Sequence, residues 1–444
     1  MHYERFNDGS VKCIEDEIPF ELPEGWEWTR LSTLTINRDS ERKPISAAQR
    51  TNVAKIYDYY GASGKIDKID KYIFNEKLLL IGEDGANLVT RSKPIAFFAE
   101  GQYWVNNHAH CIDSTDKCIL EFLCFYINAI SLEKYITGSA QPKMTQDNMN
   151  SILIALPPYK EQQQISQRLD VIWSSIDKIE FEKENVLELV DNVKSKILDL
   201  AIRGKLVPQD PNDEPASVLL ERIRGEKEEL IKQGKIKRNK KESVIFKGDD
   251  NSYYLRTNGL EEPLDDWRFN NLPETWEICC LGELCDYGDC INVNTEDIAE
   301  DAWILDLEDI EKDTGIVIKK VTKAQRNSVS TKHQFHSGQV LYSKLRPYLN
   351  KVVLSDADGY CTSEILPLEF KNCVLPEYAR YYLMSGTFLA YANHCSYGVK
   401  MPRLGTADGK KAIFPLPPLS EQKRIVETIE FYFSQLNKIS ESLA

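Results

Sequence analysis

The feature that most constrains the fold of this 444-residue chain is an internal duplication. The run LPEGWEWTRLSTL at 22–34 returns 250 residues later as LPETWEICCLGEL at 272–284. A second run, LPPYKEQQQI at 156–165, returns 260 residues later as LPPLSEQKRI at 416–425. Repeats at a long, nearly constant spacing predict two copies of one structural unit. Each copy should therefore fold in the same way around its own core.

The two copies agree at their ends and differ in the middle. EFLCFYI at 121–127 parallels EYARYYL at 377–383, and PKM at 142–144 parallels PRL at 402–404. One scaffold that presents two different surfaces would give this distribution. A duplication that simply drifted would diverge everywhere, including the ends, so we favour two surfaces on one scaffold.

Local patterns within each copy mix helix and strand. We therefore predict the α+β class, with two duplicated α/β domains joined by long antiparallel coiled-coil helices. Short apolar or alternating runs between turns predict strands, and Pro376 suits the first turn of a helix, where its missing N–H would be unpaired anyway. The strands that we expect are 78–82, 94–99, 102–107, 338–342, 351–354 and 365–370, and the helices are 116–130 and 376–385.

A long helical pattern follows each copy. In the first, apolar side chains recur at alternating spacings of four and three residues, a period of 3.5 that is typical of a coiled-coil seam. The second helix repeats this register 260 residues later. We predict that the two helices pair with one another, antiparallel if a two-fold axis relates the domains. The residues expected to pair are Ile165, Leu169, Ile172, Ile176, Ile179, Ile425, Ile429, Tyr432, Leu436 and Ile439.

The first helix would be about 60 Å long at 1.5 Å per residue, which makes it a spacer. The second helix is shorter, so we expect the stretch from Val186 to Leu200 to pack elsewhere, covered by residues 213–233. The basic run at 234–242 is more readily a solvated linker than a phosphate contact. The expected parts are a first duplicated domain at 1–160, a central spacer helix at 161–205, a helical segment and linker at 206–268, a second duplicated domain at 269–420 and a C-terminal spacer helix at 421–444.

The charge balance limits the kind of partner. The chain has 55 Lys and Arg against 69 Asp and Glu, a formal net charge of −14. This argues against a uniformly basic nucleic-acid binder, but not against basic groups that gather on a few faces. Eleven Cys, an odd number, fit free thiols in a reducing cytoplasm, and the sequence predicts neither a signal peptide nor a membrane span. We therefore expect a cytoplasmic protein.

The sequence also bears on catalysis. Residues 156–159, LPPY, resemble the Pro-Pro-aromatic motif of DNA amino-methyltransferases, but Leu156 cannot accept a hydrogen bond where that motif has Asn, Asp or Ser. Neither a G-x4-G-K-[ST] phosphate loop nor an H-E-x-x-H zinc motif occurs, and no glycine-rich loop follows a strand to bind a dinucleotide. We therefore expect no catalytic residue and no metal site.

Several loops combine positive charge with side chains that suit DNA. Arg pairs with guanine edges or phosphate, and Asn with adenine. The segments that stand out are 342–351 and 396–409 in the second copy and the loop at 138–146 in the first; at each position an ordinary solvated surface is the alternative. The candidate DNA-binding residues are Lys65, Arg91, Asn106, Asn107, His108, Gln141, Lys143, Ser343, Lys344, Arg346, Tyr348, Asn350, Lys351, Lys400 and Arg403.

Nearly the whole chain resembles the specificity subunits of type I restriction–modification enzymes. The resemblance rests on the paired W-E-x-x-x-L entries at Trp26 and Trp276, on the paired LPP exits, and on the central run AIRGKLVPQDPNDEPASVLLERIRGEKEELIKQGKIK. It implies two target-recognition domains, each reading one half of a bipartite, asymmetric DNA site. The spacer helices would set the gap between the halves.

The resemblance also implies which molecules work with this chain. The family's protein has no catalytic activity of its own, so no cofactor is expected here. Its partners would be double-stranded DNA and two methyltransferase subunits that carry S-adenosylmethionine, with restriction subunits that use ATP and Mg joined through them. The alternatives are a stand-alone sequence-specific DNA-binding regulator and the recognition part of a fused restriction–methylation enzyme, which would show catalytic sequence at one end.

Overall fold

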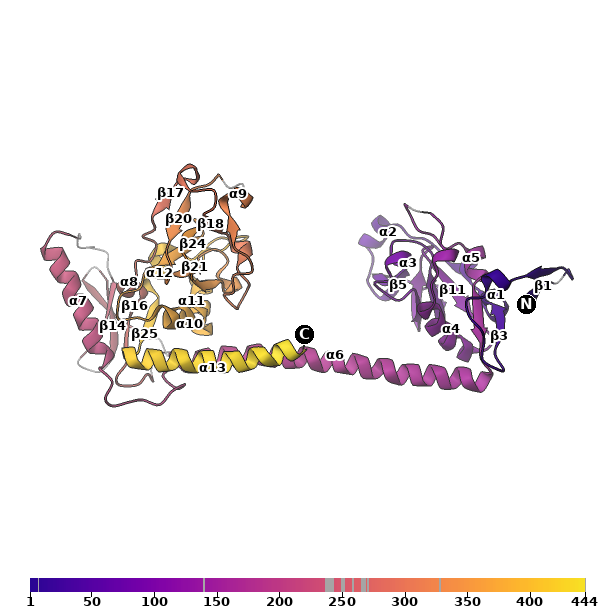
Figure 1. Ribbon diagram of the computed structural model, residues 1–444, viewed down its shortest axis with the longest axis horizontal. Coiled ribbons are helices and arrows are strands. Elements are labelled where there is room, and N and C mark those ends of the chain that lie inside the picture. Colours follow the sequence, from indigo (N-terminus) through magenta and orange to yellow (C-terminus); the bar gives the residue numbers. More distant parts are fainter. Residues whose placement is uncertain are drawn as a thin grey trace. The chain divides into compact units, whose positions relative to one another are not determined.

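The computed structural model describes residues 1–6, 8–138, 140–235, 243–248, 252–257, 259–264, 269, 271–326 and 329–443. Most of the basic run at 234–242 therefore lies outside the described residues. The chain forms two compact units, Met1–Phe181 and Glu182–Ala444. Each unit mixes helices with β-sheets, which confirms the predicted class (Figure 1).

The first unit alternates short strands with short helices and ends in one long helix. Its elements are β1 (Tyr3–Arg5), β2 (Val11–Cys13), β3 (Glu27–Arg30), α1 (Leu31–Leu34), β4 (Ile36–Asn37), α2 (Ala47–Thr51), β5 (Tyr57–Gly61), β6 (Gly64–Ile69), β7 (Phe74–Asn75), β8 (Leu78–Gly82), α3 (Asn87–Thr90), β9 (Ala96–Ala99), β10 (Gln102–Val105), β11 (Ala109–Asp113), α4 (Lys117–Ala129), α5 (Gln146–Asn150), β12 (Leu153–Leu156) and the start of α6 (Tyr159–Ile202).

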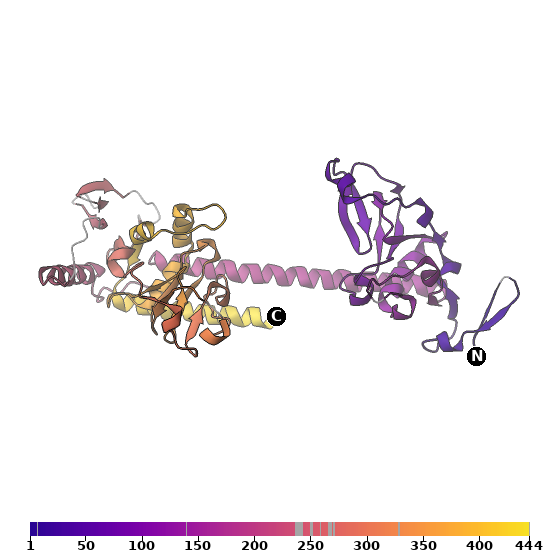
Figure 2. The same cartoon turned by 90° about the horizontal axis from the view of Figure 1, so that it is seen from above.

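Strand β8 lies at the centre of the first unit. It pairs with β11 and β9 in the sheet β4-β11-β8-β9, and every one of its residues is buried. Leu79 and Ile81 face the core that contains α4, whereas Leu78 and Leu80 face a second core against the sheet β6-β5-β10-β7. An apolar run without alternation is expected for a strand covered on both faces. By contrast, the β1–β2 hairpin stands apart from the other strands of the unit (Figure 2).

The second unit repeats this plan with insertions. Its elements are the end of α6, α7 (Ala216–Lys232), β13 (Ser243–Lys247), β14 (Tyr253–Thr257), β15 (Leu260–Pro263), β16 (Glu277–Cys280), α8 (Leu281–Leu284), β17 (Asn292–Val293), β18 (Trp303–Leu305), β19 (Val321–Thr322), α9 (Lys323–Arg326), β20 (Lys332–Phe335), β21 (Val340–Ser343), β22 (Val352–Leu354), β23 (Gly359–Thr362), β24 (Ile365–Leu368), α10 (Pro376–Met384), α11 (Gly386–Cys395), α12 (Thr406–Lys411), β25 (Ile413–Leu416) and α13 (Leu419–Leu443). The predicted strands and helices of both copies are therefore confirmed within a few residues.

The repeated ends of the two copies contact each other within each unit. The entry strand pairs antiparallel with the exit strand, β3 with β12 in the first unit and β16 with β25 in the second. Trp26 Nε1 donates to Glu161 Oε2 at 3.1 Å, and Trp276 Nε1 donates to Glu421 Oε2 at 2.9 Å. Both ends of the repeat thus form one small structure that closes each unit.

The long helices differ in part from their predicted pairing. Helix α6 has 44 residues and α13 has 25. Ile165 packs against the core of the first unit, while Ile425 and Ile429 are buried in the second unit together with the end of α6. The shared register therefore reflects how each helix starts on its own domain. Ile172 and Ile179 are 52% and 65% exposed.

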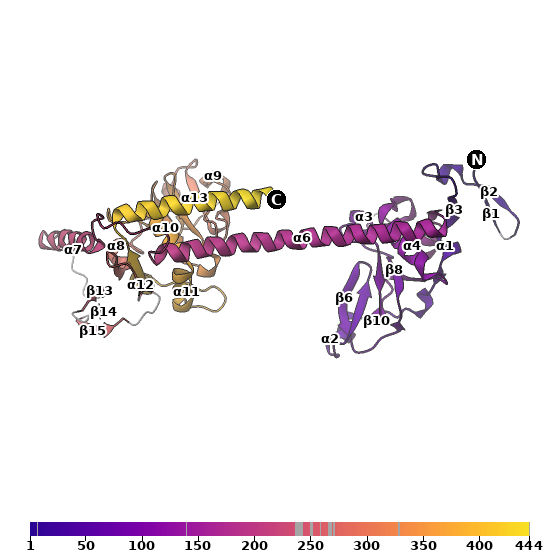
Figure 3. The ribbon, with the colours of Figure 1, turned by 90° about the horizontal axis from the view of Figure 1, so that it is seen from below.

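Within the second unit, the part of α6 after Glu182 runs beside α13 (Figure 3). Ile197, Leu198, Ala201 and Ile202 share one buried cluster with α13. Helix α7 adds Ala216, Leu219, Leu220 and Ile223 to the same cluster, as the predicted covering helix at 213–233 should. Among the described residues, no helix is long and apolar enough to cross a membrane.

Candidate nucleic-acid interface

Two segments of the first unit adjoin each other: the turn that follows β8, and the loop that precedes α5 and holds the candidates Gln141 and Lys143. Backbone hydrogen bonds join them. Gly85 N–H donates to the Pro142 carbonyl at 3.0 Å, and Met144 N–H donates to the Glu83 carbonyl at 2.8 Å. The loop is therefore fixed against the end of a buried strand, which suits a rigid recognition surface.

The second unit builds the same pair of segments after β21 and before α12. Arg346 N–H donates to the Pro402 carbonyl at 2.7 Å, and Leu404 N–H donates to the Lys344 carbonyl at 3.0 Å. The backbone pattern matches residue for residue. It makes Glu83 equivalent to Lys344, Gly85 to Arg346, and Lys143 to Arg403.

In each unit a third residue, just before a neighbouring strand, accepts a backbone hydrogen bond from the turn. Glu83 N–H donates to the His108 carbonyl at 2.9 Å, and Lys344 N–H donates to the Glu364 carbonyl at 3.0 Å. The same backbone thus presents different charges in the two units, in agreement with two surfaces on one scaffold. The equivalent triplets are Glu83, His108 and Lys143 in the first unit and Lys344, Glu364 and Arg403 in the second.

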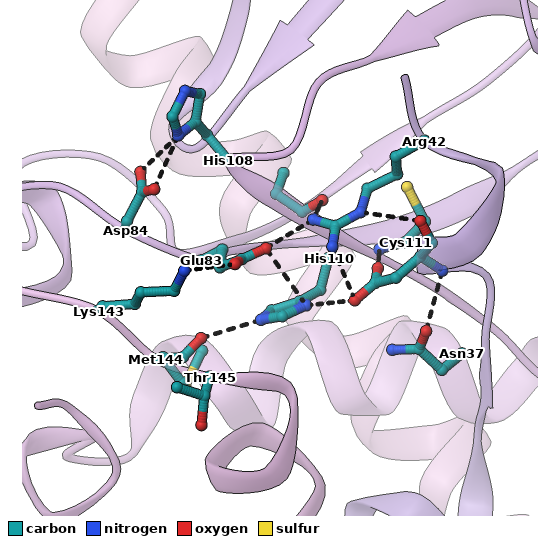
Figure 4. Close-up of polar contacts among 12 residues, drawn as sticks. Asn37, Arg42, Glu83, Asp84, His108, His110, Cys111, Lys143, Met144 and Thr145 are labelled. Atoms are coloured by element: carbon teal, nitrogen blue, oxygen red, sulfur yellow. Dashed lines mark hydrogen bonds and ion pairs between the residues drawn. The ribbon is translucent and has the colours of Figure 1, made fainter. Parts of the chain in front are cut away.

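Lys143 pairs with the Glu83 carboxylate, which also accepts a hydrogen bond from Arg42 (Figure 4). Lys143 Nζ is 3.2 Å from Glu83 Oε1, and Arg42 Nη1 donates to Glu83 Oε2 at 2.7 Å. Burial alone would raise the pKa of Glu83, but the hydrogen bond from Arg42 and the surrounding positive charges hold this pKa below its ordinary value. Glu83 is therefore ionised at neutral pH and attracts the Lys143 ammonium.

Buried His110 holds the loop that precedes α5 in place. Its Nε2 donates to the Met144 carbonyl at 3.0 Å, and its Nδ1 is 2.6 Å from Asp39 Oδ2. Burial would raise the pKa of Asp39, but its hydrogen bond and charge attraction to His110 lower this pKa overall. Because His110 is 1% exposed, it holds the loop in place and is not itself a DNA contact.

The side chains of Lys143 and His108 are 50% and 47% exposed. His108 Nδ1 lies 2.7 Å from Asp84 Oδ2, so this ring is oriented by a carboxylate just as Lys143 is. Half-exposed donors held in fixed positions can hydrogen-bond base edges or phosphate oxygens. These two residues are the best-placed candidates of the first unit.

The other candidates of the first unit differ in accessibility. Lys65 is paired with Asp58 at 2.6 Å and is 48% exposed. Asn106 is buried, and its Oδ1 accepts the His108 N–H at 2.8 Å, so it shapes the turn rather than facing solvent. Asn107 and Gln141 are exposed.

Arg91 and Asn350 have a structural part that the sequence did not indicate. Both have a left-handed backbone, with φ of 49° at each residue. The Arg91 guanidinium donates to three carbonyls at the end of α4, including that of Asn128 at 2.8 Å. Asn350 Nδ2 donates to the Met384 carbonyl at the end of the equivalent helix, α10, at 3.2 Å. In both units the side chain at this position donates to carbonyls at a helix end, which lack partners within the helix. Both side chains are therefore engaged there, although we predicted that they contact DNA.

The other candidates of the second unit also differ in their exposure to solvent. Ser343 is buried, and Lys351 Nζ donates to the Leu307 carbonyl at 2.7 Å; burial lowers the pKa of Lys351. Arg403 forms a two-bond pair with Glu364, at 2.9 and 3.1 Å. Lys400 is exposed and Tyr348 is 47% exposed, whereas Lys344, Arg346 and Arg403 are partly buried.

The acidic and buried members of these sites, among them Asp39, Arg42, Glu83 and Glu364, were not predicted from the sequence. The repeated proline at 142 and 402 pointed to the loops. Strand pairing, which brings Glu364 beside Lys344, carries no local sequence signal. In the part of the chain that is described, no group of three or more His, Cys, Asp or Glu side chains could hold a metal ion.

Comparison with known proteins finds one family domain in both copies of the repeat. The family model described as "Type I restriction modification DNA specificity domain" matches residues 23–189 and 273–443. The chain is 22% identical to the Type I restriction enzyme EcoDI specificity subunit of Escherichia coli over 95% of this chain and 84% of that one. It is 27% identical to the EcoAI specificity subunit of the same species, over 96% and 80% of the two chains.

A solved structure shares the fold. The study that reported it concerns complex assembly and conformational transition of the type I R-M system. The match covers 96% of this chain and 94% of the other, with 14% sequence identity and a TM-score of 0.56. At this identity the likeness concerns the fold alone.

Proposed function

The chain belongs to the type I restriction–modification DNA specificity family, and from this premise we propose which residues read DNA. The family's function makes it a DNA sequence-specificity subunit with two recognition domains. We infer that each unit reads one half of a bipartite site through its turn and loop pair. The observation that carries this inference is the equivalent backbone that presents Glu83, His108 and Lys143 in one unit but Lys344, Glu364 and Arg403 in the other.

The experiment measures methylation of a set of DNA duplexes by the assembled complex. Lys143→Ala should lower kcat/KM for the full site about tenfold and relax the sequence requirement in one half only, because a lost base contact is worth about 1–3 kcal/mol. Lys400→Ala should affect the other half. The matched control is Lys12→Ala on β2, where the lysine side chain is 56% exposed. An unchanged preference in both variants would remove these loops from the interface.

We also propose that this chain contributes recognition, while two methyltransferase subunits contribute catalysis and S-adenosylmethionine. Restriction subunits that use ATP and Mg would join through them. The support is that α6 exposes large apolar side chains at several positions, as interaction sites do. Val171, Trp173, Ile179 and Phe181 are 53–67% exposed.

This docking is tested by titrating the chain with purified methyltransferase subunit. Trp173→Asp should weaken binding at least tenfold, because a central aromatic anchor commonly supplies 2 kcal/mol or more. Gln167→Asp, at an exposed polar position of the same helix, is the control. Equal affinity for wild type and Trp173→Asp would contradict this docking surface. Tight specific DNA binding by the chain alone would favour a stand-alone regulator.

A further inference from the structure

The first unit contains an open apolar groove of about 450 Å³ where α6 leaves the domain. It lies between the segment before β3, helix α4 and the first turns of α6. Its walls are almost entirely apolar, and the glutamate at 21 lies at its edge. The side chains that matter here are Trp26, Phe122, Phe125, Tyr126, Ile165 and Leu169.

The second unit has the same side-chain positions, but there they are covered. Three aligned runs of the repeat, at offsets of 250, 256 and 260 residues, make Trp276 equivalent to Trp26, Tyr381 to Phe125, and Ile429 to Leu169. The three second-unit residues are buried, at 2%, 6% and 0% exposure, whereas the three first-unit residues are all partly exposed. The hydrogen bond from the tryptophan to the first glutamate of the helix is present in both units.

The cover in the second unit is the end of α6. Ile197, Leu198, Ala201 and Ile202 share one buried cluster with the equivalent groove residues. The chain then turns at Gly204, whose α-carbon approaches so closely that an added Cβ would lie 2.4 Å from Pro273 Cγ and 3.3 Å from Trp276 Cε2. An apolar helix end followed by a tight glycine turn therefore fills this groove.

The segment after the turn continues the contact with polar groups. Gln209 Nε2 donates to Glu421 Oε1 at 2.5 Å. Asp213 pairs with Arg424 at 2.7 Å and accepts a hydrogen bond from Ser420 Oγ at 2.7 Å. The groove thus receives a helix end, a turn and then a loop without regular secondary structure.

Nothing in the described part of the first unit supplies this cover. The end of α6 is committed to the second unit, since its apolar side chains are buried there. The polar positions around the first groove still suit an incoming segment. Glu161 stands at the position of Glu421, and Lys160, which is exposed, stands at that of Ser420. An amide donor and a carboxylate on the incoming segment would therefore find partners.

We propose that the groove of the first unit is a docking site for the amphipathic helix end of a partner protein. The partner's helix carries apolar side chains at two adjacent positions, repeats them after four residues, and ends in a glycine turn followed by a loop with polar side chains. This inference rests on the duplication and is independent of the residues proposed to read DNA.

The test uses a fluorescently labelled peptide with the sequence of residues 190–216 and the full-length chain. We expect saturable binding by fluorescence anisotropy, together with slower hydrogen exchange at 20–26, 122–129 and 159–169. Ala129→Trp fills the groove from an exposed position and should reduce affinity at least tenfold. Ser174→Asp, at an exposed position of α6 outside the groove, should leave binding unchanged.

Four outcomes would overturn the proposal. The first is the absence of binding to the wild-type chain, and the second is binding that Ala129→Trp leaves intact. The third is exchange protection confined to 378–385 and 425–429, because the peptide would then displace α6 in the second unit. A peptide with Leu198→Asp and Ala201→Asp should not bind; equal binding of this peptide would also contradict the proposed helix chemistry.

Discussion

Replacing Gly204 by alanine should destabilise the second unit in a measurable way. Gly204 has φ of +64°, a left-handed conformation that costs a residue with a Cβ about 1–2 kcal/mol. The added Cβ would lie 2.4 Å from Pro273 Cγ and 2.6 Å from its Cδ, and a proline ring cannot rotate away. Forcing such an atom into a packed contact costs about 1–3 kcal/mol more. The expected loss in the free energy of opening is about 2–5 kcal/mol.

Hydrogen exchange followed by mass spectrometry can measure this loss in the second unit alone, at peptides that cover 273–284 and 419–436. The matched control is Gly225→Ala in the middle of α7, where an added Cβ meets nothing within 4 Å. Alanine is the better helix former by about 1 kcal/mol, so this variant should be slightly more stable. A Gly204→Ala variant within about 0.5 kcal/mol of wild type would refute the packing described for this turn, since that is the usual range for neutral surface substitutions.

Three further predictions concern the cap at the end of α4, the pH dependence of stability and the salt dependence of DNA binding. Arg91→Asn should be milder than Arg91→Ala, because the equivalent Asn350 tolerates the same left-handed backbone and also donates to the end of its helix; thermal melting of the two variants checks this. The hydrogen bond from Arg424 lowers the pKa of Asp213, so this carboxylate stabilises the fold above pH 3.8, its ordinary pKa, and the contribution is lost as the pH falls through the lowered pKa. Asp213→Asn should therefore be less stable than wild type at pH 7, and urea unfolding should show the difference shrinking below pH 3.8; a constant difference would contradict the assignment. The affinity of the lone chain for DNA should vary little with salt, whereas that of the assembled complex should fall steeply; equal slopes in binding titrations would contradict this.

The duplication made much of the fold predictable, because its repeated ends form one contact in each unit. Trp26 and Glu161 lie far apart in the sequence, yet their repeats at 276 and 421 mark both as parts of one structure. The run at 78–82 is apolar without alternation because both faces of the strand are buried, and this pattern predicted the strand. Local apolar pattern is a sufficient signal in such cases.

The helix register was a weaker guide. A period of 3.5 predicts a seam, but it does not say whether another helix or the helix's own domain covers the seam. Ile165 and Ile425 share a register because each packs on its own unit.

The candidate site was predictable only where charge stood in an exposed loop, as at Lys143 and Lys400. Arg91 looked like a surface cation, but its backbone conformation directs the guanidinium to the end of α4. Glu364 reaches the second-unit loop through the pairing of β24 with β21. Such long-range placement depends on the whole sheet, which a local segment does not encode.

The central claim is that two equivalent domains read two different half-sites. The most direct measurement is methylome sequencing of a strain that carries the complete system, repeated with Lys143→Ala and with Lys400→Ala. We expect one bipartite motif with an unspecified gap, and relaxation of a different half in each variant. A continuous motif, or loss of both halves in each variant, would contradict it.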